Sequence, residues 1–447
     1  MPVSPARAAA FDILLRVERE SSYASELLHS AVYRKLPIVD HALATELVMG
    51  VLRWRSRLDT EILQASSQPL TKLDLEILIA LRLALYQFRW LDRIPQRAAL
   101  HESVELVKRA RKRSAAPFVN AVLRKLSAQA KDVPLRILVP AVLNSIEEIS
   151  STCSHPEWLV ERWVKVFGTE AAQKICEYDQ SIPATSIRLR TSGAEGDLAK
   201  EGVQLSPGSF LSSARRVQSG DIRKTKAFHD RRVFIQDEAS QLVAALVGNG
   251  PRILDCCAAP GGKTLAIADL NPSAAITATE LHPHRAHLMK SLVSPTSNIQ
   301  IIVADVRHLP LANNFDRILA DVPCSGTGTL ARNPEIKWRL KPEDLADLQQ
   351  RQLAILRASL THLAPHGRLI YSTCSLEQEE NEEVIEQVLA ENKQLRLREC
   401  REALDHLKSG GELSCADWSS LTRGPYLRTI PGVHPSDGFF AAILEKM

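Results

Sequence analysis

Two cysteines stand at the ends of two predicted strands in the C-terminal half of the chain. Cys324 lies in DVPCSGTGTL (321–330) and Cys374 lies in YSTCSLEQEEN (371–381). A single cysteine at a strand end is more often a small buried hydrophobic residue than a nucleophile. Two at neighbouring strand ends, one of them close to Asp321, indicate thiol chemistry, because a thiolate is a strong nucleophile. The alternative is a disulfide, which a reducing compartment disfavours.

A glycine-rich turn precedes these cysteines. LDCCAAPGGKT (254–264) ends like a phosphate-binding P-loop, but Cys257 occupies the place of the first glycine which that motif requires. The G-x-G-x-x-G pattern of a dinucleotide site is also missing. Glu280 stands 18 residues after Gly262 and ends a predicted strand, where an acid accepts hydrogen bonds from both hydroxyls of a ribose. Asp305 ends the next strand and can face a base, so the pattern predicts an adenosine-type ligand without a phosphate cradle, such as S-adenosylmethionine.

The elements that must position these residues are short strands separated by helix-length segments. This alternation begins at residue 236 and predicts a parallel sheet with helices on both faces. In such folds, ligands bind beyond the C-terminal ends of the strands. The predicted strands are RILDCCA (252–258), AITATE (275–280), IQIIVAD (299–305), RILADVPC (317–324) and RLIYSTC (368–374).

The front of the chain has a different character. Residues 1–130 are predicted to be helical throughout, and LDLEILIALRLALYQFRWL (73–91) is apolar on most of its surface, which predicts a central buried helix. Residues 1–140 carry 22 Lys/Arg against 14 Asp/Glu, so a net charge of +4 for the whole chain leaves −4 for the remainder. Basic clusters at Arg53/Arg55/Arg57 and Lys108–Arg113 predict contact with RNA or DNA, the alternative being solvated helix faces.

Between these regions we expect a linker and a small domain. KDVPLRILVP (131–140) is predicted to be a linker, residues 156–180 one helix, and ATSIRLRT (184–191) a strand. Short strand candidates continue to FIQDEAS (234–240). The sequence therefore predicts three domains, which are an all-helical domain over 1–140, a small α+β RNA-binding domain over 150–235, and an α/β domain over 236–447.

The paired cysteine motifs resemble those of the RNA 5-methylcytosine methyltransferase family, the NOL/NOP/Sun group. RNPEIKW (332–338), Glu380-Asn381 and HPSDGFFAAILEK (434–446) also fit that pattern, although Glu335 stands where the family usually has Asp and LVSPTSNIQ (292–300) lacks the usual Asn-x-x-Arg-x-Gly run. The helical front resembles the RNA-binding factor NusB in two segments, LRLALYQFRWLDRIPQRAALHESVELVKR (81–109) and FVNAVLRK (118–125).

The resemblance implies a Rossmann-like, S-adenosylmethionine-dependent methyltransferase domain behind a NusB-like domain, with 16S rRNA of the small ribosomal subunit as substrate. It implies that Cys374 is the nucleophile toward carbon 6 of a cytosine and that Cys324 helps in its release. DNA cytosine methyltransferases use the cysteine after the proline instead, the position of Cys324, so spacing alone leaves the roles open. We expect Asp321 to hold a proton against ring nitrogen 3, with burial favouring its protonated form. Cofactor contacts are expected from Cys257, Ala258, Ala259, Pro260, Gly261, Gly262, Lys263, Glu280, Asp305 and Asp321.

Composition narrows the remaining classes. The eight cysteines lack paired C-x-x-C spacing, so no metal site is predicted. No apolar run of membrane-spanning length and no secretory signal is evident, so we expect a cytoplasmic protein without membrane contact, and a monomer. The alternatives left open are a tRNA cytosine-C5 methyltransferase, a non-catalytic NusB-like RNA-binding factor, and a P-loop nucleotidase, which Cys257 disfavours.

Overall fold

The computed structural model describes residues 3–20, 22–130, 143–293, 298–309, 311 and 314–447. The chain forms two compact units, which we call the helical unit (residues 1–182 and 330–339) and the sheet unit (residues 183–329 and 340–447). The helices expected in the middle domain belong to the helical unit, and its strands belong to the sheet unit. The predicted boundaries at 140, 150 and 235 stay predictions, and the linker predicted at 131–140 lies outside the described residues.

The helical unit is built around α5, as the sequence predicts. Most side chains of α5 between Ile77 and Phe88 are buried, so this helix has neighbours on all sides. Its Arg82 is only 3% exposed, and its charge is met inside the unit by Asp59 and Glu18. The helices of this unit are α1 (Pro5–Glu20), α2 (Ala24–Leu28), α3 (Ile38–Arg53), α4 (Arg55–Ala65), α5 (Leu75–Trp90), α6 (Gln96–Arg109), α7 (Ala116–Ala130), α8 (Ile146–Cys153), α9 (Glu157–Phe167), α10 (Thr169–Gln180) and α16 (Ile336–Arg339).

Two features of this unit differ from the sequence-based expectation. The single helix predicted over 156–180 is two helices, α9 and α10, because Gly168 adopts a φ of 86° between them. The segment 330–339, which lies between strands of the large sheet in sequence, packs with the helical unit. Within it the Trp338 indole donates to the carbonyl of Leu52 at 2.6 Å, and Glu335 accepts from the backbone N–H of Ala24 at 2.9 Å.

The sheet unit contains a small antiparallel sheet in the order β2-β3-β1-β4. Its own apolar core includes Ile187, Leu198 and Val233. Arg190, just after β1, pairs with Asp269 of α14 at 2.8 Å, and Arg188 pairs with the same carboxylate. The elements are β1 (Ser186–Leu189), α11 (Ala194–Lys200), β2 (Gln204–Pro207), β3 (Ala214–Ser219), α12 (Lys226–His229) and β4 (Val233–Ile235).

The large sheet has the order β11-β12-β13-β9-β8-β5-β6-β7, with β10 paired to β13. The five strands predicted from the sequence, β5 to β9, are all present and parallel, whereas β10 to β13 add antiparallel strands, so the sheet is mixed. The strands are β5 (Arg252–Asp255), β6 (Ala275–Glu280), β7 (Ile299–Val303), β8 (Phe315–Asp321), β9 (Leu363–Thr373), β10 (Leu395–Arg398), β11 (Thr422–Arg423), β12 (Tyr426–Thr429) and β13 (Phe439–Lys446).

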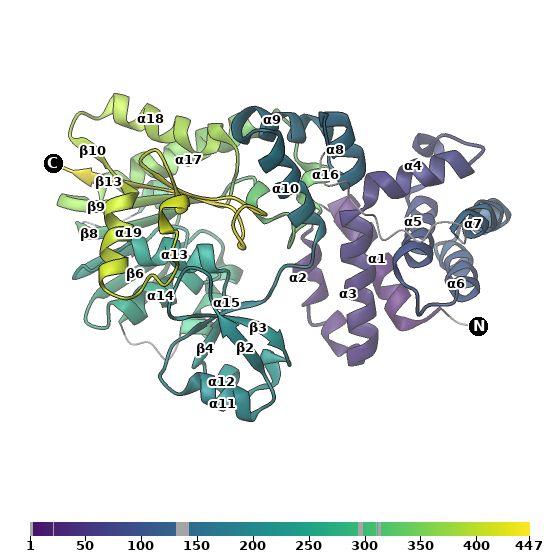
Figure 1. The fold of residues 1–447 in the computed structure, drawn as a ribbon, viewed down its shortest axis with the longest axis horizontal. Coiled ribbons are helices and arrows are strands. Elements are labelled where there is room, and N and C mark those ends of the chain that lie inside the picture. The colour runs from purple at the N-terminus through teal and green to yellow at the C-terminus, as the bar shows by residue number, and fades with distance from the viewer. Residues whose placement is uncertain (1–2, 21, 131–142, 294–297, 310, 312–313) are drawn as a thin grey trace. The chain divides into compact units, whose positions relative to one another are not determined.

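Helices cover both faces of this sheet (Figure 1). Ile253 and Leu254 are consecutive in β5 and point to opposite faces, and both are 0% exposed, which requires cover on each side. One face packs against α13 (Glu238–Leu246), α14 (Gly262–Leu270), α15 (Pro283–Val293) and α19 (Cys400–Ser409). The other packs against α17 (Asp344–Thr361) and α18 (Glu382–Glu391). The arrangement is Rossmann-like, as predicted.

The strand register brings the predicted chemistry to one edge. Strands β8 and β9 are parallel neighbours, and Asp321 at the end of β8 lies opposite Ser372 of β9. The loops that follow them therefore leave the sheet at the same edge as the turn after β5. In the part of the chain that the structure describes, no helix combines the length and apolar character needed to cross a bilayer.

Candidate active site

The glycine-rich turn connects β5 to α14. Gly261 precedes the helix with a φ of 106°, and a Cβ there would lie 2.9 Å from Cγ of Met289, so both conformation and packing demand glycine. The backbone N–H of Ala258 donates to the carbonyl of Thr279 on β6 at 2.9 Å, which ties the turn to the neighbouring strand. The first N–H groups of α14 lack partners within the helix, and such a helix N-terminus favours a carboxylate.

Asp255, at the end of β5, is a buried acid that the sequence analysis did not single out. It is 1% exposed, its Oδ2 accepts from the hydroxyl of Thr264 at 2.6 Å, and its Oδ1 has no hydrogen-bond partner among the described residues. Burial raises the pKa of Asp255 to about 7, and the charge of Asp321 acts in the same direction. The only sequence signal for it is an acid directly after a buried apolar strand.

The two acids predicted to hold a nucleoside end adjacent strands. Glu280 ends β6, is 4% exposed, and accepts from the backbone N–H of His282 at 2.9 Å. Arg285 approaches its other oxygen at 3.8 Å and also donates to the carbonyl of Ala259 at 3.2 Å, so this arginine links the acid to the glycine-rich turn. A carboxylate at this place suits the hydroxyls of a ribose.

Asp305 follows β7 and is already engaged with its own neighbour. The side chain of Arg307 donates to both oxygens, the shortest contact being 2.6 Å, and this hydrogen bonding lowers the pKa of Asp305. Its role toward a base, predicted from sequence, stays a prediction. The residues of the turn and these two acids fit an adenosine ligand with a free carboxylate, and the turn offers no glycine at Cys257 for wrapping a phosphate chain.

Asp321 sits between two donors. The ammonium of Lys263 donates to Oδ2 at 2.7 Å, and the hydroxyl of Ser372 donates to Oδ1 at 2.7 Å. Burial by itself lowers the pKa of Lys263, but the charge and hydrogen bond of Asp321 outweigh it, so the pKa of Lys263 is raised. The side chain of Asp321 is 25% exposed, and the expectation that it holds a proton against a cytosine ring stays a prediction.

The two cysteines meet at this edge. The Sγ atoms of Cys324 and Cys374 are 3.4 Å apart, and both thiols are free and partly exposed. The hydrogen bond to Cys374 and then burial raise the pKa of Cys324 well above its ordinary value. Either thiol can donate in this contact, which places the two sulfurs within reach of one base. The sequence predicted that both residues lie at this edge but not the distance between them.

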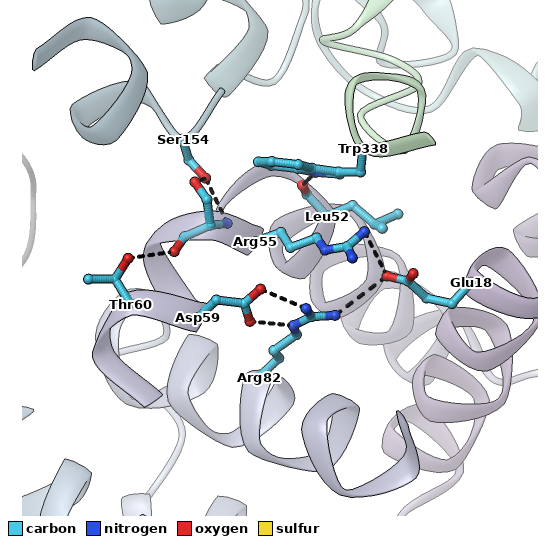
Figure 2. A network of polar contacts seen from close by, with 9 residues as sticks. Glu18, Leu52, Arg55, Asp59, Thr60, Arg82, Ser154 and Trp338 are labelled. Carbon is cyan, nitrogen blue, oxygen red and sulfur yellow. Dashed lines mark hydrogen bonds and ion pairs between the residues drawn. The ribbon is translucent and has the colours of Figure 1, made fainter. Parts of the chain in front are cut away.

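The first of the two basic clusters predicted to contact nucleic acid, Arg53/Arg55/Arg57, makes hydrogen bonds and ion pairs inside the helical unit. Arg53 is 6% exposed and donates to the carbonyl of Ala331, so its guanidinium is engaged inside the helical unit, and the nucleic-acid contact expected at Arg53/Arg55/Arg57 stays a prediction. Figure 2 shows Arg55 and Arg82 converging on Glu18, at 3.0 and 3.4 Å.

The second cluster keeps more of its charge at the surface. Arg111 and Arg113 are exposed and have no ion-pair partner among the described residues, whereas Lys112 pairs with Asp74 at 2.9 Å. Surface pairs of this kind are weak and exchange readily for phosphates. Lys108 and Arg109 are also exposed, and each pairs with an acid. The exposed charge of this cluster is consistent with the predicted contact with RNA or DNA, which stays a prediction.

Comparison with known proteins supports both units. Residues 244–445 match the model of the 16S rRNA methyltransferase RsmB/F family, and residues 4–128 match the NusB family. The chain is 35% identical over 407 residues to the probable ribosomal RNA small subunit methyltransferase B of Bacillus subtilis, covering 88% of this chain and 90% of the relative. It is 30% identical over 425 residues to ribosomal RNA small subunit methyltransferase B of Klebsiella pneumoniae, covering 92% of each.

A solved structure agrees with the fold of the sheet unit. The methyltransferase homolog protein from Pyrococcus horikoshii is 26% identical, with a TM-score of 0.56 over 68% of this chain and 100% of the other. The family of the chain follows from three findings, which are a NusB domain, a mixed Rossmann-like sheet and relatives that match over most of their length. The chain belongs to the ribosomal RNA small subunit methyltransferase B family, whose members are S-adenosylmethionine-dependent RNA methyltransferases.

Proposed function

We propose that this protein methylates carbon 5 of one cytosine in 16S rRNA through a covalent bond between Cys374 and carbon 6 of that base. The observation that carries the proposal is the pair of free thiols 3.4 Å apart at the strand edge that also presents Asp321. The names of the relatives supply the small-subunit rRNA as substrate.

Covalent catalysis answers a chemical difficulty. Carbon 5 of cytosine is a poor nucleophile because the ring is aromatic and electron-poor. When the thiolate of Cys374 adds to carbon 6, the ring becomes an enamine with electron density at carbon 5. The glycine-rich turn, Glu280 and Asp305 would hold S-adenosylmethionine, whose sulfonium would supply the electrophilic methyl group that carbon 5 attacks, leaving S-adenosylhomocysteine as a neutral thioether.

Asp321 and Lys263 stabilise the charge that develops on the cytosine ring. As the thiolate adds, ring nitrogen 3 becomes more basic and takes up a proton from solvent, and Asp321 accepts a hydrogen bond from the resulting N–H. Lys263 keeps its own proton and orients that carboxylate through its hydrogen bond to Oδ2.

Release of the product requires the reverse of the addition. The proton on carbon 5 leaves to solvent, its electron pair restores the double bond between carbons 5 and 6, and Cys374 departs as a thiolate. The proton on nitrogen 3 then returns to solvent, which leaves neutral 5-methylcytosine. We infer that Cys324 assists this departure by donating the hydrogen bond that stabilises the leaving sulfur. The raised pKa of Cys324, due first to its hydrogen bond with Cys374 and then to burial, supports that role.

The substrate must present an unstacked base, because a duplex hides the ring face that a thiolate attacks. We infer that the exposed charges of the Lys108–Arg113 cluster and the small antiparallel sheet bind the surrounding RNA backbone.

Bisulfite sequencing of ribosomal and transfer RNA tests the proposal in cells with the gene, without it, and with a Cys374→Ala copy. One 5-methylcytosine in 16S rRNA should disappear in the second and third strains. Loss of a methylcytosine from tRNA instead would identify tRNA as the substrate in place of 16S rRNA. No loss in any RNA would favour a non-catalytic RNA-binding factor.

A further inference from the structure

The loops that carry the two cysteines are joined by one buried carboxylate. Glu380 lies in the short 3-10 turn Gln378–Glu380 before α18 and is 0% exposed. We propose that Glu380 is a positioning residue whose carboxylate locks the loop after β8 to the loop after β9 and thereby fixes the separation of the Cys324 and Cys374 sulfurs. This inference rests on the proposed function, in which both sulfurs act on one base.

Each loop is held directly beside its cysteine. Glu380 accepts from the backbone N–H of Ser325 at 2.8 Å and from its hydroxyl at 2.5 Å. It also accepts from the hydroxyl of Ser375 at 2.5 Å. Ser325 follows Cys324 in sequence and Ser375 follows Cys374, so a shift of either serine moves the adjacent thiol. The two hydroxyl oxygens are themselves 3.0 Å apart.

The carboxylate is in turn fixed from outside the two loops. Gln352 of α17 donates to Glu380 at 2.8 Å and to the carbonyl of Pro323 at 3.0 Å, so the peptides on both sides of Cys324 are restrained. The hydroxyl of Tyr371 donates to the backbone carbonyl of Glu380 at 2.6 Å. The four hydrogen bonds to this carboxylate restrain it, because loss of any one of them leaves a buried polar group with fewer partners.

The charge of Glu380 also bears on the protonation of Cys324. All four donors to its carboxylate in the described part of the chain are uncharged, so no cation neutralises it. After the hydrogen bond to Cys374, burial and the charge of Cys374, the charge of Glu380 raises the pKa of Cys324 further. Among the described residues, Tyr371 also interacts electrostatically with Cys324 and with Asp321, and the cation Lys263 interacts with Cys374. The charge of Glu380 thus favours the thiol form of Cys324.

The test uses Glu380→Gln, which preserves the shape of the side chain and removes its charge. We expect kcat for methyl transfer to 16S rRNA to fall about a hundred-fold with little change in the KM for RNA, because displacement of reacting groups by about 1 Å has that effect. The pH dependence of Cys324 alkylation by iodoacetamide, followed by peptide mass spectrometry without RNA or cofactor, should shift to lower pH.

Glu238→Gln is the matched control. Glu238 is also buried, at 1% exposed, and accepts from three backbone N–H groups, those of Ser209, Phe210 and Leu211, but contacts neither cysteine. It should lose stability while kcat and the alkylation profile stay at wild-type values. If Glu380→Gln behaves like this control, the proposal is overturned.

A second variant covers the case in which Glu380→Gln does not fold. The double variant Ser325→Ala with Ser375→Ala keeps the carboxylate and removes two of its three ties to the cysteine loops. It should lose kcat by a similar factor, and a wild-type kcat would refute the locking role. Failure of the proposed function is distinguishable from failure of the Glu380 proposal. In the first case, the wild-type protein would methylate no rRNA. The alkylation profile of Cys324 would still decide the role of Glu380.

Discussion

At the scale of single residues, side chains of the same type differ in pKa or in burial because their neighbours differ. Cys324 and Cys374 have similar sequence surroundings, yet the pKa of Cys324 is raised by its hydrogen bond to Cys374 and by burial. Asp255 and Asp321 both end strands of the sheet, but Asp255 is buried while Asp321 contacts Lys263. Removing single side chains separates these roles.

Substitution of the two cysteines should have opposite consequences for the covalent adduct. Cys374→Ala should lower methyl transfer by more than about a thousand-fold and leave cofactor binding intact, because no sulfur adds to the base. Cys324→Ala should accumulate a protein–RNA adduct, because the departing sulfur loses its hydrogen-bond donor. A denaturing gel with labelled RNA detects the adduct. If Cys374→Ala forms an adduct and Cys324→Ala forms none, Cys324 is the nucleophile and Cys374 is the residue that assists release.

Asp255 predicts a pH-dependent stability. Its pKa is raised by burial from 3.8 to about 7, so its contribution to stability is complete below pH 3.8 and is lost as pH rises through 7. The unfolding free energy should decrease by about 1 kcal/mol between pH 6 and 8 on this account. Asp255→Asn, which cannot ionise, should lack that part of the decrease. Urea denaturation followed by circular dichroism at both pH values measures it, and equal decreases in both proteins would contradict the assignment.

At the scale of elements, the two cysteine loops close on each other through backbone contacts. The N–H of Gly328 donates to the carbonyl of Cys374 at 2.9 Å, and its own carbonyl accepts from Gly438 at 2.7 Å. The loop after β8, the loop after β9 and the start of β13 therefore pack without room for a side chain at this crossing. Such close packing transmits small displacements directly to the thiols.

A single methyl group should disrupt this crossing. In Gly328→Ala the new Cβ would lie 2.3 Å from the carbonyl oxygen of Gly438 and 2.9 Å from that of Cys374, so the backbone must move. We expect kcat to fall about a hundred-fold and stability to decrease by roughly 1–3 kcal/mol. Gly196→Ala is the control, since nothing lies within 4 Å of its Cβ position. Rate assays and urea denaturation compare the pair, and equal kcat values would show that the loops tolerate displacement.

At the scale of the whole molecule, positive charge is concentrated in the N-terminal part of the chain, while catalysis belongs to the sheet unit. Residues 1–140 carry 22 basic and 14 acidic side chains. Some of these basic side chains are paired inside the helical unit, as Arg55 and Arg82 are with Glu18. The basic side chains available to RNA are therefore fewer than 22 and are better represented by the Lys108–Arg113 cluster.

Removing that charge should weaken RNA binding in a salt-dependent way. In the triple variant Arg111→Gln, Lys112→Gln and Arg113→Gln, the slope of log affinity against log salt should become shallower by roughly 0.7–0.9 for each phosphate that the protein no longer neutralises. Fluorescence anisotropy with 16S rRNA fragments at several salt concentrations measures the slope. Arg357→Gln with Lys393→Gln and Lys408→Gln removes the same charge from other exposed positions and should leave the slope unchanged. An unchanged slope in the first variant would assign the cluster to solvent contact alone.

The sequence by itself determined the framework of the sheet and the position of its chemistry. Parallel strands buried on both faces require continuous apolar runs, which is why β5 to β9 could be predicted, and the C-terminal ends of parallel strands meet at one edge, which is why Asp321, Cys324 and Cys374 could be expected together. The antiparallel strands β10 to β13 and the break at Gly168 were not predicted, because short strands and single turns leave a weak local pattern.

Hydrogen bonds between residues far apart in the sequence, and the pKa shifts that they cause, could be found only in the folded structure. Arg53 and Ala331 are separated by 278 positions, and Ser325 and Glu380 by 55, so no local period records these contacts. Folding buries the groups and removes the water that would screen them, which is why only the folded structure shows that Arg53 is structural, that Glu380 joins two loops, and that contact with Cys374 and burial raise the pKa of Cys324.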